Sequence, residues 1–409
     1  MTTSERAPRL LTPAEADALI ARHTLTLPEV SLPLSQCAGA VLREVVRAER
    51  DQPPFDRVTM DGIALDSAAI RAGTRRFRIE ATQAAGDAPR ALSSAHGCIE
   101  VMTGASLPEG CDCVVAVEQI SVKDGIASLD ERVEVQPWQN VHRRGTDARQ
   151  GVQLLTPGTQ LGSVEIALVA AAGMARIRVS NQPMLAVIST GNELVEPGEP
   201  VLPHQVRRSN AYAIAAALRL RGYSRVGLDH MRDEPAALKE RLKFYLETHD
   251  VLVLSGGVSM GRLDLVPQTL AELGVRCVFH KIAQRPGKPL WFGVAPGGAA
   301  VFALPGNPVS TAICVSRYVL PALAAAQGHT PQQPPERIAL GVPFTVGPAL
   351  TFFLPVRVAT DDRGTRAALP RPTHGSGDFI SLAGTDGFIE LPPGPKAYPS
   401  GFVARLYRW

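Results

Sequence analysis

Residues 183–327 alternate between short apolar runs and segments with helical periodicity, and this pattern most limits the folds open to the chain. Strands that alternate with helices are typical of a mainly parallel, doubly wound sheet. Such sheets bind ligands at the carboxyl ends of their strands. The predicted strands are 184–189, 225–228, 251–254, 275–279, 291–294 and 300–303, and the predicted helices are 210–221, 235–247, 264–273 and 308–325.

Three glycine-rich turns lie in this region. They read Ser-Gly-Gly-Val-Ser-Met-Gly at 255–261, Gln-Arg-Pro-Gly-Lys-Pro at 284–289 and Leu-Pro-Gly-Asn-Pro-Val-Ser at 304–310. Glycine lets backbone N–H groups approach an anion closely, and a helix that begins after the turn adds the positive end of its dipole. Because Arg285 and Lys288 add fixed positive charge, we expect a site for a phosphate or another oxyanion.

Three carboxylates, Glu193, Asp233 and Asp264, follow predicted strands and would meet at one edge of the sheet. Each one alone is also explained as a helix cap or a first-turn acid. Together they would repel an anionic ligand unless a cation stood between them. Oxygen ligands without His or Cys favour a hard ion, so the pattern predicts Mg²⁺ as the cofactor.

The turn at 257–261 also matches the Gly-Xaa-Ser-Xaa-Gly nucleophile elbow, with Ser259 as the nucleophile. A serine hydrolase would need a His in a loop after a late strand of the sheet, and His280, His329 and His374 occupy no recognisable loop of that kind. The turn also lacks the Gly-Lys-Ser/Thr of a P-loop. We therefore interpret it as an anion-binding turn and keep the hydrolase as an alternative.

The chain on either side of this region predicts further domains. Thr12, Pro13 and Glu15 form a capping box at the start of a first helix, and 164–172 is a second helix with Ser163 as its N-cap and Gly173 as its stop. Packing of these two helices would make 51–142 an insertion. The predicted domains are a discontinuous N-terminal domain (8–50 plus 143–182), an inserted β-rich domain (51–142), the α/β domain (183–327) and a small C-terminal β-barrel (328–409).

Composition excludes several classes of function. The formal net charge of the 409 residues is +3 and no run of five Lys or Arg occurs, so nothing favours binding to nucleic acid. The sequence contains no run of 18 apolar residues, which a membrane span would need. It also lacks the apolar N-terminal segment of a signal peptide. The six cysteines lack zinc-like spacing, so we expect isolated buried thiols in a reducing cytoplasm.

In order along the chain, these motifs resemble the molybdopterin molybdenumtransferase family, the bacterial MoeA proteins related to the gephyrin E domain. The resemblance rests on Phe-Asp at 55–56, Met-Asp-Gly at 60–62, Met-Thr-Gly-Ala at 102–105, Pro-Glu-Gly at 108–110, Arg-Gly at 144–145 with Asp147, Ser-Thr-Gly at 189–191 with Glu193, Arg-Asp at 232–233, and the three glycine turns. So many ordered motifs are specific together, although each alone is weak.

The resemblance implies that the chain inserts molybdate into adenylylated molybdopterin, with Mg²⁺-dependent cleavage of the adenylate and release of AMP. It implies a homodimer whose cleft lies between the α/β domain of one subunit and the inserted domain of the other, and it suggests the molybdopterin adenylyltransferase as a further partner. The implied catalytic residues are Asp61, Asp233, Asp264 and Lys288, and the implied metal ligands are Glu193, Asp233 and Asp264. The implied substrate-binding residues are Thr103, Asp147, Glu193, Gly256, Gly257, Ser259, Arg285, Pro305, Asn307, Pro308 and Ser310.

Five positions depart from the family's usual pattern, at Val58, Ile63, Thr146, Asn192 and Arg285. The last exchanges a compact ammonium for a planar guanidinium and keeps the charge. We interpret these differences as variation within the family. A non-catalytic pterin-binding or scaffold protein on the same fold is the second interpretation, because fold alone does not fix function.

Overall fold

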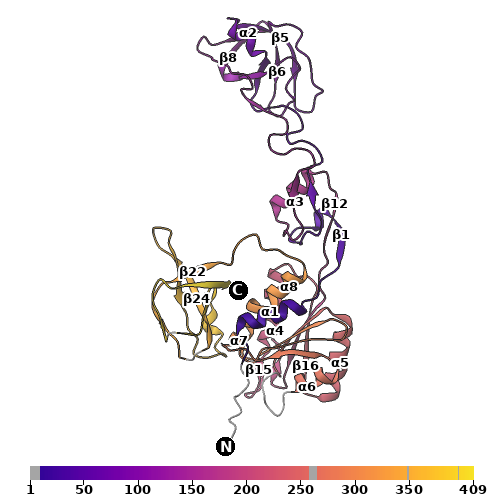
Figure 1. Ribbon diagram of the computed structural model, residues 1–409, viewed down its shortest axis with the longest axis vertical. Coiled ribbons are helices and arrows are strands. Elements are labelled where there is room, and N and C mark those ends of the chain that lie inside the picture. The colour runs from indigo at the N-terminus through magenta and orange to yellow at the C-terminus, as the bar shows by residue number, and fades with distance from the viewer. Residues whose placement is uncertain (1–9, 258–264, 348–349, 395) are drawn as a thin grey trace, which may run out of the picture.

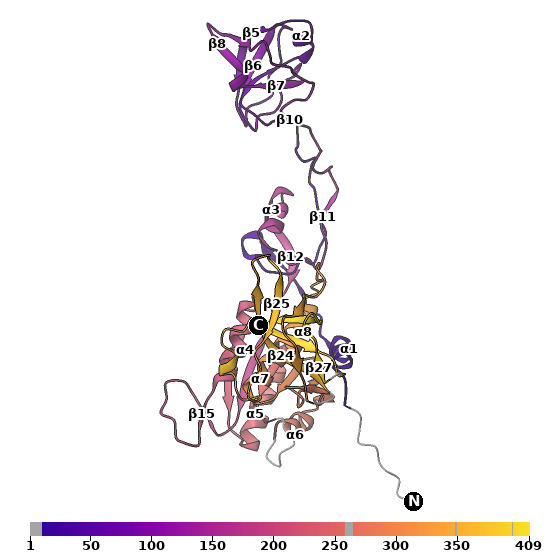
Figure 2. The same cartoon turned by 90° about the vertical axis from the view of Figure 1, so that its left-hand side faces the viewer.

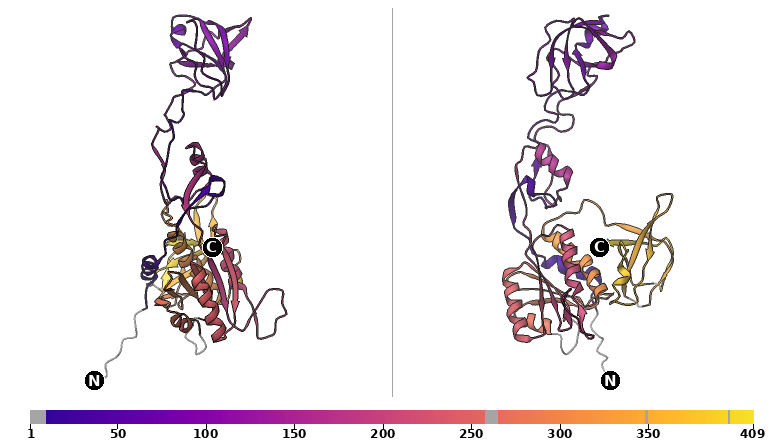
Figure 3. Two further views of the ribbon diagram at one scale, coloured as in Figure 1. Left: turned by 90° about the vertical axis from the view of Figure 1, so that its right-hand side faces the viewer. Right: turned by 180° about the vertical axis from the view of Figure 1, so that it is seen from behind.

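The computed structural model describes residues 10–257, 265–347, 350–394 and 396–409. The molecule is elongated, with a β-rich body at one end and an α/β domain beside a small barrel at the other (Figure 1). A narrow connection and a small unit around α3 (Ser163–Ala171) lie between the two ends. The two further views in Figure 3 show the β-rich body standing apart from the rest.

The α/β domain is built on a six-stranded sheet with the order β16-β13-β17-β21-β20-β18. The first four strands run parallel, and β20 is antiparallel to both of its neighbours. The strands are β13 (Leu185–Thr190), β16 (Val226–Met231), β17 (Val251–Ser255), β18 (Arg276–His280), β20 (Trp291–Val294) and β21 (Ala300–Leu304). The helices are α4 (Ser209–Leu220), α5 (Pro235–Thr248), α6 (Leu265–Glu272), α7 (Pro308–Cys314) and α8 (Leu320–Ala326).

Both faces of this sheet are covered, as a doubly wound fold requires. Leu185 and Val187 of β13 pack in a core cluster with α4 and with the helical segment 308–326, whereas Ala186 and Ile188 face α5 and α6 on the other side. The predicted strands and helices of this domain are all present, with bounds shifted by at most a few residues. The predicted mainly parallel α/β fold is therefore confirmed.

The segment 308–326 has the length and apolar composition of a membrane span, but 78% of it is buried inside the protein. It is therefore the core helix of the α/β domain. A π-helical turn (Val315–Val319) interrupts it just before Pro321. Proline lacks an N–H and clashes with the carbonyl four residues earlier, so a wider turn accommodates it.

Helix α1 (Pro13–His23) begins with the expected capping box, in which the Glu15 N–H donates to Thr12 Oγ1 at 3.2 Å and the Thr12 N–H donates to Glu15 Oε2 at 2.7 Å. The expectation that the two N-terminal helices pack together is wrong. Ala16 and Ile20 of α1 lie in the core of the α/β domain with Leu323. An apolar stripe this short fits several partners, so the sequence did not identify the right one.

Helix α3 packs elsewhere, in a separate core cluster with Cys37, Leu42 and Val179. Its N-cap is Gly162 and not Ser163 as expected, because the Glu165 carboxylate itself accepts the Gly162 N–H at 2.9 Å and closes the first turn. Strand β1 (Glu29–Pro33) pairs with β12 (Arg176–Ser180), and β2 (Val46–Arg47) pairs with β11 (Gln153–Leu155), all antiparallel. The chain thus leaves and re-enters this unit through adjacent strands.

Between β2 and β11 the chain forms the β-rich body, a six-stranded sheet with the order β7-β4-β6-β5-β9-β8. Phe77, Ile63 and Val115 are fully buried in its core. Its elements are β3 (Arg57–Val58), β4 (Gly62–Leu65), α2 (Ser67–Arg71), β5 (Arg76–Gln83), β6 (Gly97–Val101), β7 (Cys113–Ala116), β8 (Ile120–Lys123), β9 (Ile126–Leu129) and β10 (Val141–His142).

The C-terminal part is a closed barrel, as expected, because β24 pairs with both β25 and β26 and the ring continues through β22 and β28. Its strands are β22 (Arg337–Leu340), β24 (Thr351–Thr360), β25 (Arg366–Pro370), β26 (Gly387–Leu391) and β28 (Val403–Arg408), with a short pair β23 (Phe344–Thr345) and β27 (Ala397–Tyr398). Strand β19 (Gln284–Arg285) of the α/β domain extends this sheet by pairing in parallel with β24. The barrel is thereby fixed to the middle glycine turn.

All six cysteines are free thiols, and five of them are buried. Cys277 is exposed, so the expectation that every thiol is buried is wrong at this position. It lies on β18, an edge strand of the sheet, where alternate side chains face outward.

A buried arginine joins three parts of the fold. Arg317 of the core helix is 5% exposed and donates to both Asp17 carboxylate oxygens of α1, at 2.7 and 2.8 Å. Its Nε also lies 3.3 Å from Glu390 Oε2 of the barrel. A cation removed from water needs such partners, because its desolvation is costly.

Asp17→Ala leaves two donors of the buried Arg317 without their carboxylate, so we expect the unfolding free energy to fall by about 1.5–3 kcal/mol. Urea unfolding followed by circular dichroism measures this loss. Lys243→Ala is the control: it removes an exposed ion pair with Glu247 and should cost less than about 1 kcal/mol. Equal losses in the two variants would contradict the role of Arg317.

Candidate functional site

A pocket of about 760 Å³, the strand-end pocket, lies at the carboxyl ends of the parallel strands of the α/β domain. Glu193 follows β13, Asp233 follows β16, and the turn after β17 adds Gly256 and Gly257. The turn after β21 contributes a further stretch of wall at 305–308. One pocket therefore brings together two of the three predicted metal-binding acids and two of the glycine turns.

The first glycine turn has a backbone that other residues would not adopt. Gly256 and Gly257 have φ values of +101° and +65°. A Cβ atom on Gly256 would lie 2.5 Å from the Thr190 carbonyl oxygen. Glycine is therefore required for β13 and β17 to end this close together. The remainder of the turn, with the predicted Ser259 and Asp264, lies outside the described residues.

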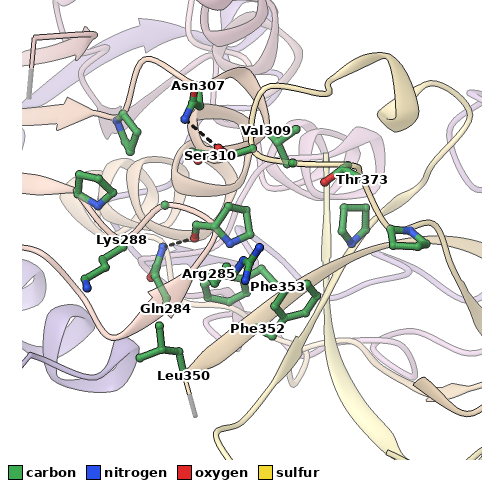
Figure 4. A pocket seen from close by; sticks show the side chains of 18 of the residues that line it. Gln284, Arg285, Lys288, Asn307, Val309, Ser310, Leu350, Phe352, Phe353 and Thr373 are labelled. Atoms are coloured by element: carbon green, nitrogen blue, oxygen red, sulfur yellow. Dashed lines mark hydrogen bonds between the residues drawn. The ribbon is translucent and has the colours of Figure 1, made fainter. Parts of the chain in front are cut away.

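A second pocket of about 380 Å³, the barrel-side pocket, lies between the α/β domain and the barrel (Figure 4). Arg285, Lys288 and Ser310 line it from the α/β domain, and Phe352 and Thr373 line it from the barrel. The two pockets adjoin, because both are lined by Pro289, Pro305 and Asn307.

Buried contacts fix the turn that carries Arg285 and Lys288. Gln284 is fully buried, and its Nε2 donates to the Pro286 carbonyl at 3.1 Å while its Oε1 accepts from the Tyr318 hydroxyl. The pairing of β19 with β24 holds the same turn from the barrel side. Both cationic side chains are exposed at the surface of this fixed turn. Positive charge is therefore set beside the pocket before any ligand arrives.

Asn307 connects the third glycine turn to the barrel, because its Nδ2 donates to Ser376 Oγ at 2.8 Å. Ser310, two residues into α7, is 3% exposed and lines the barrel-side pocket. Pro308 opens α7 and lines the strand-end pocket. The residues predicted in this turn thus all face one of the two pockets.

Asn210 was not predicted, and it ties the two ligand-facing turns together. Its Nδ2 donates to Ser255 Oγ at 2.9 Å and to the Gly306 carbonyl at 2.7 Å, and it lies 3.3 Å from Thr311 Oγ1. Arg208, one residue before α4, was also missed, although it lines the strand-end pocket. Arg208 and Asn210 could have been found in the sequence from their position at the start of a predicted helix, because helix N-termini often bind anions.

Three predicted residues lie far from these pockets. Asp61 accepts from the Thr103 N–H at 2.6 Å and from the Thr103 hydroxyl at 2.7 Å, and these bonds lower the pKa of the Asp61 carboxyl below its ordinary value. Asp147 lies 2.8 Å from His142 Nε2, just after β10. Figure 2 places β10 at the base of the β-rich body, at the opposite end of the molecule. A single chain does not bring these residues to the pockets.

Protein-family models match nearly the whole chain. Residues 11–173 match the MoeA N-terminal region (domain I and II). Residues 186–325 match a probable molybdopterin binding domain, and residues 337–408 match the MoeA C-terminal region (domain IV). The matches follow one another in the order that the resemblance requires.

Known proteins agree with these matches. A molybdopterin molybdenumtransferase of Synechocystis sp. is 35% identical over 98% of this chain and 100% of its own length. One of Bacillus subtilis is 32% identical over 89% of this chain and 86% of its own length. A MoeA crystal structure from Pyrococcus horikosii superposes with a TM-score of 0.79 at 28% identity, covering 98% of this chain and 99% of that one. The chain therefore belongs to the MoeA family of molybdopterin molybdenumtransferases, which serve in molybdenum cofactor biosynthesis.

Proposed function

We propose that this protein inserts molybdenum from molybdate into adenylylated molybdopterin, with cleavage of the adenylate and release of AMP. The observation that carries the proposal is the pair of adjoining pockets, one lined by carboxylates and a glycine turn and the other by exposed cations. Two pockets of this kind suit a reaction that joins a small oxyanion to a larger phosphorylated substrate. The relatives named for this activity support it.

In this proposal the barrel-side pocket holds the oxyanion. Arg285 and Lys288 attract it, and the buried Ser310 hydroxyl can donate a hydrogen bond from the opposite turn. Because the turn that carries both cations is fixed by the buried Gln284, their charges need little rearrangement when the ligand binds. This supports a role in holding molybdate close to the strand-end pocket.

We further propose that Mg²⁺ binds in the strand-end pocket. Glu193 and Asp233 both line it, and their oxygen atoms fit this ion. The described residues include no cluster of three or more His, Cys, Asp or Glu side chains placed to hold a metal. Mg²⁺ commonly binds through one or two carboxylates together with substrate phosphates and water, so the pair present is sufficient. When bound, the ion would neutralise charge on the phosphate oxygens of the substrate.

A second copy of the chain would complete the site. Asp61 and Thr103 are exposed on the β-rich body, far from the pockets of their own chain (Figure 1). Both hydrogen bonds from Thr103 end on Asp61 Oδ1, so Oδ2 keeps its capacity to accept another bond. We propose a homodimer in which the body of each subunit faces the strand-end pocket of the other. A cytoplasmic location and transfer of substrate from the molybdopterin adenylyltransferase belong to the same proposal.

Lys288→Ala should lower the rate of cofactor formation about 10²- to 10³-fold, because it removes fixed positive charge from the oxyanion pocket. The assay reconstitutes an apo-molybdoenzyme from purified protein, adenylylated molybdopterin and molybdate. Lys123→Ala, in the β-rich body, is the charge-matched control and should keep full activity. Full activity in Lys288→Ala would exclude the proposed role of the turn, and binding of substrate without any AMP release by the wild type would favour a scaffold.

Chelation by EDTA should abolish AMP release, and added Mg²⁺ should restore it. In Asp233→Asn the Mg²⁺ concentration for half-maximal release should rise about 10-fold, because one ligand loses its charge. Asp362→Asn, on an exposed barrel loop, controls for the loss of one carboxylate. AMP release that is unaffected by EDTA would contradict the proposed cofactor.

A mixed dimer tests the shared site directly. Asp61→Ala and Lys288→Ala should each be inactive alone, but a mixed dimer contains one site with neither substitution. Co-expression with separate tags should recover about a quarter of wild-type activity, since half of the dimers are mixed and each mixed dimer has one of two sites intact. Activity no higher than that of the separate variants would show that both residues act within one chain.

A further inference from the structure

The strand-end pocket collects buried polar atoms that lack partners. In the part of the chain that the structure describes, five buried side-chain nitrogen or oxygen atoms make no hydrogen bond. Two of these atoms, Ser189 Oγ and Thr190 Oγ1, belong to residues that line this pocket and have no partner among the described residues. A third, Arg208 Nε, lines it too and has an ion pair with the partly exposed Glu196 but no hydrogen bond. Because such groups are costly to bury, an unpaired cluster at a cavity indicates a ligand.

All three side chains are donors. Ser189 is 1% exposed, Thr190 is 3% exposed and Arg208 is 8% exposed. The two hydroxyls come from the last two residues of β13, and Arg208 lies immediately before α4. A guanidinium together with two hydroxyls suits an acceptor with several oxygen atoms and negative charge.

The start of α4 adds to this preference for an anion. Arg208 occupies its N-cap position, and its side chain makes no capping hydrogen bond to the first turn of this helix. Ser209 and Asn210, the next two residues, also line the pocket. The N–H groups of an uncapped first turn and the positive end of the helix dipole both stabilise a negative ligand.

Among the described residues, Arg208 forms an ion pair with the carboxylate of Glu196. The Arg208 Nε lies 3.1 Å from Glu196 Oε2, and the Tyr212 hydroxyl of α4 donates to Glu196 Oε1. Glu196 follows β14 (Leu194–Val195) on an arm that returns through β15 (Val206–Arg207) and projects from the α/β domain (Figure 2). The Glu196 side chain is 43% exposed, so this ion pair is only partly removed from water.

We propose that Arg208, Ser189 and Thr190 form a phosphate-binding subsite at the N-terminus of α4, which takes a phosphate ester of the substrate. The proposal rests on the proposed function for the identity of that substrate. Glu196 occupies Arg208 while the subsite is empty and competes with the phosphate. The carboxylates Glu193 and Asp233 lie in the same pocket, so the subsite supplies the positive charge that offsets them.

Binding of AMP, inorganic phosphate and adenosine to the full-length protein, measured by isothermal titration calorimetry, tests this subsite without turnover. Arg208→Gln should weaken the binding of phosphate-bearing probes about 10- to 100-fold, whereas Arg208→Lys should retain most of it. Adenosine should bind both variants as it binds the wild type. Arg219→Gln, exposed on α4 outside the pocket, controls for the lost charge.

Two further variants separate recognition from folding. Thr190→Val should weaken phosphate binding about 3- to 10-fold without lowering Tm, because its hydroxyl makes no hydrogen bond with the described residues. Glu196→Gln should tighten binding about 2- to 5-fold, the size of a partly exposed ion pair. If the Arg208–Glu196 contact served only the stability of the fold, Arg208→Gln and Glu196→Gln would both lower Tm. Neither variant would then change the affinity for phosphate-bearing probes selectively.

The outcomes distinguish the subsite from the proposed function. Loss of phosphate binding in Arg208→Gln but not in Lys288→Ala supports the subsite even if no molybdenum is inserted. Sensitivity of inorganic phosphate but not of AMP to Arg208→Gln also supports it and assigns the subsite to the pterin phosphate. Unchanged affinity of Arg208→Gln for both AMP and inorganic phosphate, with unchanged Tm, would overturn the proposal.

Discussion

The structure depends on a parallel sheet that is buried on both faces. Every residue of β13 is buried, with alternate side chains in two different core clusters. Such a strand has no room for polar side chains until it ends, because a polar group between two apolar layers would lose its hydrogen bonds to water. Ser189 and Thr190 come at that point. Burial of the sheet therefore confines the chemistry to one edge.

The barrel helps to position this edge of the sheet, because strand β19 of the α/β domain pairs with β24 of the barrel. Strand β19 extends the barrel sheet, and the same two residues begin the turn that carries Lys288. Arg317 connects the barrel to α1 and to the core helix through two carboxylates. A hinge between barrel and α/β domain would have to break both connections together. The cations of the barrel-side pocket are thus held in place by contacts outside the pocket.

Local patterns in the sequence predicted local structure well. The capping box at Thr12 and the strands of the α/β domain are present, and so are the two glycine turns at 284–289 and 304–310, because each depends on neighbouring residues. The packing of α1 was missed, since Ala16 and Ile20 would fit against any apolar surface. Asn210 and Arg208 were missed for a related reason: only the fold shows that the start of α4 opens on the strand-end pocket.

Asp61 belongs neither with the features that local patterns predicted nor with the residues that sequence analysis missed. Only the family resemblance singled it out, and the structure shows that Thr103 donates two hydrogen bonds to its carboxylate just before β4. Those bonds also keep the carboxyl ionised, since they lower its pKa, and the side chain stays exposed. The β-rich body that carries this charge stands at the opposite end of the elongated molecule from the α/β domain (Figure 1). The homodimer proposed above would give this carboxylate a pocket to face on the other copy.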